Sequence, residues 1–523
     1  MKIIHERKRT RIMMKNYKTI LLFGFLIICT LFVNCIKKEQ PEPQSRVLVE
    51  VGDRAITVNE FLKRAEYTIR PPYCKSDYGV SKKIVLNSLI AEKMMALEEN
   101  PDSVIERGTR AAKYIQGRKE QAMRRYHFYM HGSQKVELDT SEIKDIYKLA
   151  GRKYRIKYFT FPDPKLAQEF MKRLEKNDHS FEKAIKGSNT EDEIKIPEKE
   201  VKFNSNPAEG IHAALYSKKA RNLSSGDIVG PVETNAKDYV IMQIESITRK
   251  VGLSNEQIKV RYNDVKNKLI QRKGRQIYAE YVQELMSGKK MNFNRQVFGR
   301  LAGIFSEIYS ITKKQEKQTL NKAVWGKNIE QELSDSLGRE LNDYNPRVFF
   351  TLNGEEWTVE DFREALLTHP LVFRKKDIQG QRDFTKQFKL AIADLIRDHF
   401  ITRDAYEDGY DQRDYVKNYT NMWRDEILAT YNKYQYLKTS GYDGNFEKNY
   451  MQAINNYLNQ YVDILQKKYN KEIFIDTEAF NEIELTGIDL VALESNVPYP
   501  IVVPNFPIVT TDAKLDYGQK MGE

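Results

Sequence analysis

The chain has 523 residues, of which 41% are hydrophobic and 30% charged, a composition that excludes both a disordered chain and a polytopic membrane protein. At roughly 100 to 200 residues per domain, this length predicts about three modules. The formal net charge is +12, but half of it lies in residues 1–34, and the remainder forms no basic stripe or recognition motif. The sequence therefore predicts a folded protein that does not bind nucleic acid.

The start of the chain has the pattern of an export signal. Two lysines precede the apolar run Ile20–Val33, which suits the core of a signal peptide better than a membrane-spanning helix of about 20 residues. The run ends at Cys35 and resembles a bacterial lipobox, in which cleavage makes the cysteine the lipid-bearing N-terminus. We therefore predict a lipoprotein signal peptide over 1–34, a linker over 35–46 and lipidation at Cys35.

Several features of this signal stay open. An uncleaved N-terminal anchor is the alternative to lipidation, and Met1, Met13 and Met14 are all candidate start sites. Ile36 follows the cysteine and is not an aspartate-type signal for retention in the inner membrane. The outer membrane is therefore favoured in a host that has two membranes.

The cysteines fit an exported chain that does not rely on disulfides. Cys29 would be removed with the signal and Cys35 would carry lipid, so only Cys74 remains and no internal disulfide can form. Cys74 has no histidine or acidic partner at a catalytic spacing, and we expect it to be structural.

Residues 47–150 are predicted to form a mostly helical domain. Val47–Val51 alternates as a strand and is followed by a turn. Thr57 and Glu60 then have the spacing of a capping box, which starts a helix. Apolar residues at helical period over 80–99 predict a core-facing helix, and further helices follow to the end of this segment.

Residues 151–250 change period and predict a domain of sheet and helices. A strand begins at Tyr154, and a helix covers Lys165–Leu174. A short helix is expected over Ala208–Ala220, and Gly226–Ile244 has the pattern of a β-hairpin.

An internal match relates two distant parts of the chain. Arg46–Ala65 aligns without gaps with Arg347–Leu366, and this alignment pairs Thr57 with Thr358. Both copies are followed, after a loop, by an apolar helix. Agreement in spacing and in helix start favours duplication over coincidence, and we predict a second helical module over 346–440.

Two further segments complete the predicted organisation. Residues 251–345 are expected to be a helical connector. Residues 441–523 contain a helix near Phe446–Tyr469 and a short strand, and then a tail, Val497–Val509, whose four prolines favour extended backbone. This tail could lie along another domain or reach a partner.

Parts of the chain resemble a family of exported foldases. Residues 47–130, with the sequence Thr57-Val58-Asn59-Glu60-Phe61 after the first strand, resemble the N-terminal helical domain of SurA- and PrsA-like proteins. Residues 154–247 resemble the parvulin domain inserted in those proteins, most specifically through Leu223–Val232, "LSSGDIVGPV". The resemblance implies an α+β fold, with mostly helical chaperone modules and an inserted parvulin-like domain of sheet and helices.

The catalytic residues of that family do not carry over. Active parvulins have one histidine in the first strand, where this chain has Lys157 or Tyr158, and another in the last hairpin, where it has Val240. The central site would fall within 187–207, which does not align residue by residue. Prolyl isomerisation requires a polar network that lowers a barrier of about 18–20 kcal/mol. We therefore predict no catalytic residue, and a parvulin-like fold without its chemistry.

No metal ion or cofactor is predicted. His127 and His131 stand four apart on a predicted helix and could share a metal ion, but no third ligand lies near them in the sequence. Two exposed histidines are the ordinary outcome of such a pattern. Phosphate-binding glycine loops and metal-binding cysteine clusters are absent as local sequence signals.

These observations favour a lipid-anchored chaperone of the cell envelope, facing the periplasm. Such a holdase would bind unfolded exported or outer-membrane polypeptides without ATP and would assist their folding or transit. Two alternatives stay open: an active peptidyl-prolyl cis-trans isomerase with a divergent site, and a structural envelope lipoprotein that binds one partner. Whether the protein is an enzyme is undecided, and the missing histidines favour the answer no.

Overall fold

A computed structural model describes residues 46–521, apart from several short internal segments. The segments outside the description are 76–77, 99–104, 107, 178–180, 187–195, 206–207, 235–237, 250–253, 324–334, 376–377, 379 and 487–489. The predicted signal peptide, the linker and the lipidation site Cys35 lie outside the described residues.

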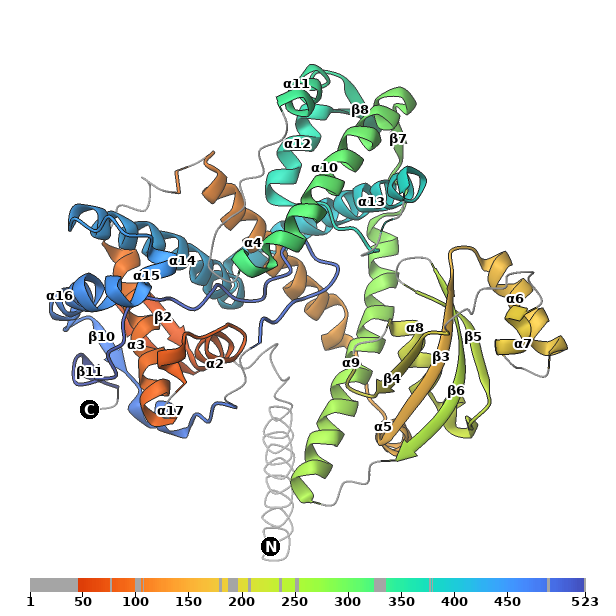
Figure 1. Cartoon of the computed structure of the whole chain (residues 1–523), viewed down its shortest axis with the longest axis horizontal. Helices are drawn as coiled ribbons and strands as arrows, with labels where there is room; N and C mark the ends of the chain where they lie inside the picture. The colour runs from red at the N-terminus through yellow and green to blue at the C-terminus, as the bar shows by residue number, and fades with distance from the viewer. Residues whose placement is uncertain are drawn as a thin grey trace, which may run out of the picture. The chain divides into compact units, whose positions relative to one another are not determined.

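The fold is α+β, as the sequence predicted, with long helices around three small sheets (Figure 1). The first sheet has the strand order β11-β10-β1-β2, the second β4-β3-β6-β5 and the third β7-β8-β9. Each sheet lies in a module with an apolar core of its own.

The first module joins the beginning of the described chain to its end. Its elements are β1 (Val47–Val51), β2 (Arg54–Thr57), α2 (Val58–Glu66), α3 (Tyr78–Leu97), α15 (Phe446–Ala453), α16 (Asn459–Tyr469), β10 (Ile473–Ile475), α17 (Thr477–Glu482) and β11 (Gln519–Lys520). β10 pairs antiparallel with β1, with Val49 opposite Ile475. Side chains from both ends of the chain therefore share one core. From the sequence, residues 441–523 were predicted to form a separate segment.

The second module is built around β8 (Val348–Leu352). Its other elements are β7 (Met291–Phe293), α10 (Arg295–Ala323), α11 (Asp335–Asp343), β9 (Glu355–Thr358), α12 (Val359–Thr368) and α13 (Gly380–Glu407). β7 pairs with β8, and α10 packs against α13. The segment expected to be only a helical connector, 251–345, thus contributes a strand and a core helix to this module.

The two segments matched in the sequence have the same local structure. Val47 lies opposite Thr57 in the first hairpin, Val348 lies opposite Thr358 in the second, and both hairpins carry a register shift directly after that pair. Thr57 and Thr358 each cap the helix that follows by accepting a hydrogen bond from the backbone N–H three residues on.

The expected capping box at Thr57 is only half formed. The Thr57 hydroxyl accepts from the backbone N–H of Glu60 at 3.1 Å. The Glu60 carboxylate does not return to the Thr57 backbone and instead forms an ion pair with Lys93 at 3.0 Å. The local pattern predicted that the Glu60 side chain would bond to the start of its own helix. It pairs with Lys93 instead, because a buried ammonium group without a partner is costly.

Each hairpin gains a third strand at an equivalent place. The backbone N–H of Asp476 donates to the carbonyl of Leu48 at 2.9 Å, and that of Asn294 donates to the carbonyl of Phe349 at 2.9 Å. Asp476 caps α17 and Asn294 caps the start of α10. In the first module this strand is β10, from the end of the chain. In the second module it is β7, which precedes the hairpin with α10 and α11 between them.

The middle domain surrounds the second sheet. Its elements are α5 (Thr140–Ala150), β3 (Arg152–Phe161), α6 (Pro164–Lys176), α7 (Phe181–Lys186), β4 (Glu198–Lys202), α8 (Glu209–Tyr216), β5 (Ile228–Glu233), β6 (Tyr239–Arg249) and α9 (Asn255–Leu285). All neighbouring strands are antiparallel, and β3 and β6 pair along their whole length. One face packs on α5, α8 and α9, and the other on α6 and α7.

Helix α4 (Arg110–His131) connects the modules. It packs against α9, α12, α13 and the helix α14 (Asp414–Thr439). The proline-containing tail lies along it: Arg118 donates to the carbonyl of Ile501 at 2.7 Å, and Gln121 exchanges hydrogen bonds with the backbone of Tyr499. Of the two roles expected for the tail, the structure shows packing along another part of the same chain.

Candidate functional site

Val240 lies near the start of β6 in the middle domain. It stands opposite Thr160 on β3 and Val232 on β5. Its side chain is 5% exposed and belongs to the apolar cluster on the sheet face that packs on α5, α8 and α9. A buried valine at this position can neither donate nor accept a hydrogen bond.

The structure separates the two candidates for the first histidine position. Tyr158 belongs to the same apolar cluster as Val240, on the same face of the sheet. Lys157 points to the other face, because neighbouring residues in a strand alternate. Its ammonium group forms an ion pair with Glu245 at 3.0 Å. Tyr158, and not Lys157, is therefore the structural counterpart to consider beside Val240.

Two polar side chains on the same face of the sheet form structural hydrogen bonds at the end of β3 that lies away from Val240. The Tyr216 hydroxyl lies 2.9 Å from the carbonyl oxygen of Arg152 and 3.1 Å from that of Val201. The His212 Nε2 lies 3.0 Å from the carbonyl of Phe203, so Nε2 carries a proton and donates. Burial lowers the pKa of His212 to about 4, and its ring is neutral at physiological pH. These hydrogen bonds tie α8 to the strands and stabilise the fold.

A cavity of about 700 Å³ opens at the end of the sheet, beside the start of α9. Its lining combines Val260 and mostly polar or charged residues of α9 with several cations from the strand ends. The lining includes Phe203, Val260, Arg152, Lys153, Lys202, Arg249 and Arg261, together with Glu256 and Asp264. Val260 is 54% exposed, and Ile258 and Tyr262 on the same helix are also exposed. Such a surface can contact an extended polypeptide through apolar and backbone-directed interactions.

A second exposed apolar surface lies before the tail. Leu490, Val491 and Leu493 are exposed, and Leu493 forms an isolated β-bridge with Ile501. Glu494, the residue after Leu493, forms an ion pair with Arg125. These side chains are held at the surface by a rigid segment.

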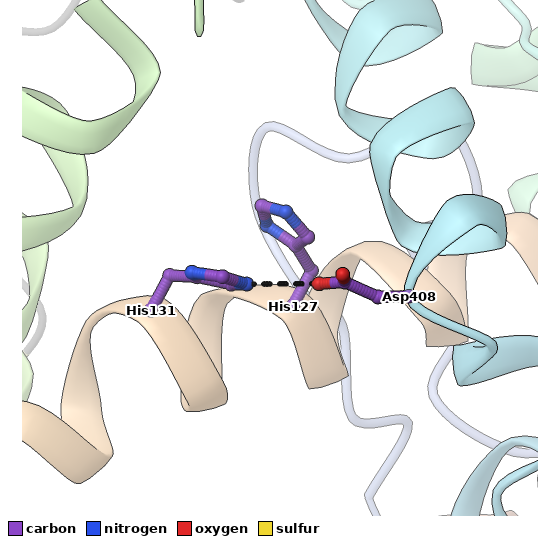
Figure 2. A group of neighbouring side chains, drawn as sticks. All are labelled: His127, His131 and Asp408. Carbon is purple, nitrogen blue, oxygen red and sulfur yellow. Dashed lines mark hydrogen bonds and ion pairs between the residues drawn. The ribbon is translucent and has the colours of Figure 1, made fainter. Parts of the chain in front are cut away.

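His127 and His131 lie in a polar cluster that the sequence did not predict. His127 is fully buried, so the expectation of two exposed histidines was wrong for this residue. Asp408 provides the neighbouring group that sequence proximity lacked, at 3.2 Å from His131 Nε2 (Figure 2). Asp404 and Asp408 are themselves four residues apart, a spacing that could have indicated a second half of the cluster.

Cys74 is the cysteine that was predicted to be structural. Cys74 is buried in the first core, at 1% exposure. Among the described residues, no helix combines the length and apolar character that crossing a membrane requires.

The geometry thus defines an α+β protein in which helical modules flank an antiparallel sheet domain. No protein-family model matches the chain, and no curated protein matches it. Two solved structures are similar to part of it. The foldase protein PrsA from Streptococcus pneumoniae has 12% identity and a TM-score of 0.20 over 42% of this chain and 85% of that chain. The foldase protein PrsA from Lactococcus lactis has 13% identity and a TM-score of 0.18 over 46% and 93%. Likeness at this level carries no argument about function.

Proposed function

We propose that this protein is an exported, lipid-anchored chaperone that holds unfolded polypeptides and uses its parvulin-like domain as a scaffold. The observation that carries the proposal is the core around Val240: the sheet domain keeps all four strands, but apolar packing occupies the place where a catalytic pair would stand. A domain retained without that chemistry contributes through its surface.

Exposed apolar side chains in two modules support binding to unfolded clients. On α9, Val260 lines the cavity while Ile258 and Tyr262 are exposed elsewhere on the helix, and a second set is exposed at Leu490–Leu493, before the tail. Many weak apolar contacts can shield a client without a catalytic constellation and without ATP. The cations that line the cavity add attraction for acidic or backbone carbonyl groups of a client.

The first experiment separates a holdase from an isomerase. The chain from residue 36 onward should suppress aggregation of an unfolded outer-membrane protein. It should leave the cis/trans exchange of a short X-Pro peptide at its uncatalysed time of tens to hundreds of seconds. Clear acceleration of that exchange would replace the holdase by an active isomerase. Suppression limited to one folded partner would instead support a structural lipoprotein.

The binding surface is tested by truncating exposed residues on one helix. Ile258→Ser combined with Val260→Ser should weaken suppression of aggregation, because both side chains are exposed and apolar. Lys259→Ser on the same exposed stretch is the matched control and should keep full suppression. Equal loss in both variants would show that client binding does not use the apolar side chains of α9.

The membrane anchor is a separate part of the proposal. Palmitate label should enter the wild-type chain and be absent from Cys35→Ala, whose precursor should stay unprocessed. The sequence after Cys35 favours the outer membrane, and fractionation of a host with two membranes would test this placement. Label retained in Cys35→Ala would contradict lipidation at this cysteine.

A further inference from the structure

The polar cluster around His127 lies where three helices meet. His127 and His131 are one turn apart on α4, and their ring centroids are 4.4 Å apart. Asp408 follows the last turn of α13 and lies beside His131 (Figure 2). One ligand atom from each of these three residues lies within 4.8 Å of the other two.

The spacing of these atoms is close to that of a metal site. His131 Nε2 and Asp408 Oδ2 are 3.2 Å apart. Two ligands of a tetrahedral zinc ion, at bond lengths of about 2.0–2.2 Å, lie roughly 3.3 Å from each other. Because the three ligand atoms lie within 4.8 Å of one another, tetrahedral ligation requires the widest pair to close by about 1.5 Å at most, within the range of side-chain rotation.

Neighbouring residues already orient the buried histidine. The His127 Nδ1 lies 2.8 Å from the Tyr278 hydroxyl on α9, and its Nε2 lies 2.8 Å from Asp404 Oδ2. Asp404 also accepts a hydrogen bond from Tyr281 at 2.6 Å. A histidine that ligates a metal through one nitrogen is commonly held in place by a hydrogen bond at the other. Ligation through one nitrogen of His127 would displace the partner at that nitrogen and leave the hydrogen bond at the other in place.

We propose that His127, His131 and Asp408 bind one divalent transition-metal ion of the zinc type, with Asp404 as a positioning residue. Two imidazoles and a carboxylate are ligands that zinc accepts in proteins, and a water molecule can complete the tetrahedron. Such an ion ties α4 to the end of α13, beside α9, which leads out of the sheet domain. This role is independent of client binding.

The test uses the chain from residue 36 onward, without a histidine tag and freed of metal with a chelator. Titration with Zn²⁺ by calorimetry should give one site per chain. Co²⁺ should give the visible absorption of a tetrahedral ion with nitrogen and oxygen ligands. Zn²⁺ should also raise the melting temperature, because an ion that binds only the folded state stabilises it.

Two ligand variants and one matched control decide the result. His131→Gln and Asp408→Asn should each weaken Zn²⁺ binding at least tenfold and remove the Co²⁺ absorption. Both residues lie near the surface, at 17% and 42% side-chain exposure, and circular dichroism of each metal-free variant checks that it folds. The control variant His399→Gln changes a histidine on α13 that contacts Trp357 and is not a proposed ligand. It should bind Zn²⁺ as the wild type does.

Two outcomes would overturn the proposal. One is no heat and no Co²⁺ absorption in the wild type up to millimolar metal. The other is equal Zn²⁺ affinity in the wild type and in both folded ligand variants, which would place the ion elsewhere on the chain.

Discussion

The first and second modules share a strand-turn-helix backbone and each has an apolar core, but the first core also holds buried charges whereas the second is rich in aromatic rings. Behind β1 and β2, the first module buries a network of charges: Arg64 with Glu92 at 2.7 Å, and Lys93 with both Glu60 and Asp425 at 3.0 Å. Behind β8 and β9, the second module packs aromatic rings. Those rings belong to Phe298, Phe305, Phe349, Phe350, Phe362, Phe384 and Phe388.

This difference shows which features the backbone requires and which it leaves free. Both hairpins keep the same register and both helices keep a threonine cap, because register and cap fix the geometry of the motif. The space behind them accepts either rings or paired ions, provided that it is filled and every charge has a partner.

The largest expected losses of stability come from substitutions that remove one buried side chain from each core. Lys93→Met leaves the carboxylates of Glu60 and Asp425 buried without their shared ammonium group, and this should cost about 3–5 kcal/mol of stability. Urea unfolding followed by hydrogen exchange should locate the loss in α3 and β1. Lys83→Met, at an exposed site of the same helix, is the control and should change stability by at most about 0.5 kcal/mol.

A similar loss is expected in the second core by a different mechanism. Phe388→Ala removes a fully buried ring and leaves a cavity, which should cost about 3–5 kcal/mol. Hydrogen exchange should rise in α13 and β8 and stay unchanged in β1. If Phe388→Ala loosened α3 as much as α13, the two cores would unfold as one unit, and the comparison would fail.

A smaller effect is expected from pH, through the buried carboxyl group of Glu426 on α14. Burial and the charge of Glu92 raise the pKa of Glu426 to about 7, above its ordinary value of 4.5. The folded state therefore binds the extra proton between these two values, and stability falls as pH rises through this window. Unfolding measured from pH 5 to pH 8 should show a loss of about 1–3 kcal/mol that is absent from Glu426→Gln. A parallel pH profile in that variant would contradict the assignment.

The smallest effect distinguishes the two helix caps. Thr358 forms a complete capping box, in which Asp361 returns to its backbone N–H at 2.9 Å. The equivalent Glu60 is engaged by Lys93, so Thr57 caps alone. Thr358→Ala should cost about 1–2 kcal/mol and Thr57→Ala about 0.5–1 kcal/mol. A larger loss at Thr57, measured in the same unfolding assay, would reverse this order.

Local sequence patterns predicted the elements whose signals lie close together in the chain. The apolar stripe of α3, the threonine caps and the hairpin of β5 and β6 each depend on residues that are close together in the sequence. Patterns could not predict that β10 joins β1, because this pairing depends on which strand edge is free in the folded molecule.

The same limit applies to the candidate sites. The place of Val240 in the hairpin is what predicts that a catalytic histidine is absent there, and this stays a prediction. The choice between Lys157 and Tyr158 required the register of β3 against β6, since a shift of one residue moves a side chain to the other face. Asp408 lies 277 residues from His131 in the sequence, and only the packing of α13 on α4 brings them together.

The pairing of β10 with β1 has a consequence if the chain is exported from its N-terminus, as we propose. Val49 pairs with Ile475, which lies about 430 residues later in the chain, whereas Phe293 pairs with Phe350 after only about 60 residues. Closing the longer loop costs roughly 2 kcal/mol more in chain entropy. During translocation, the second module can therefore fold while the first still lacks a strand. The earliest segment to emerge would be the last to mature, and its exposed edge would itself need protection until the end of the chain arrives.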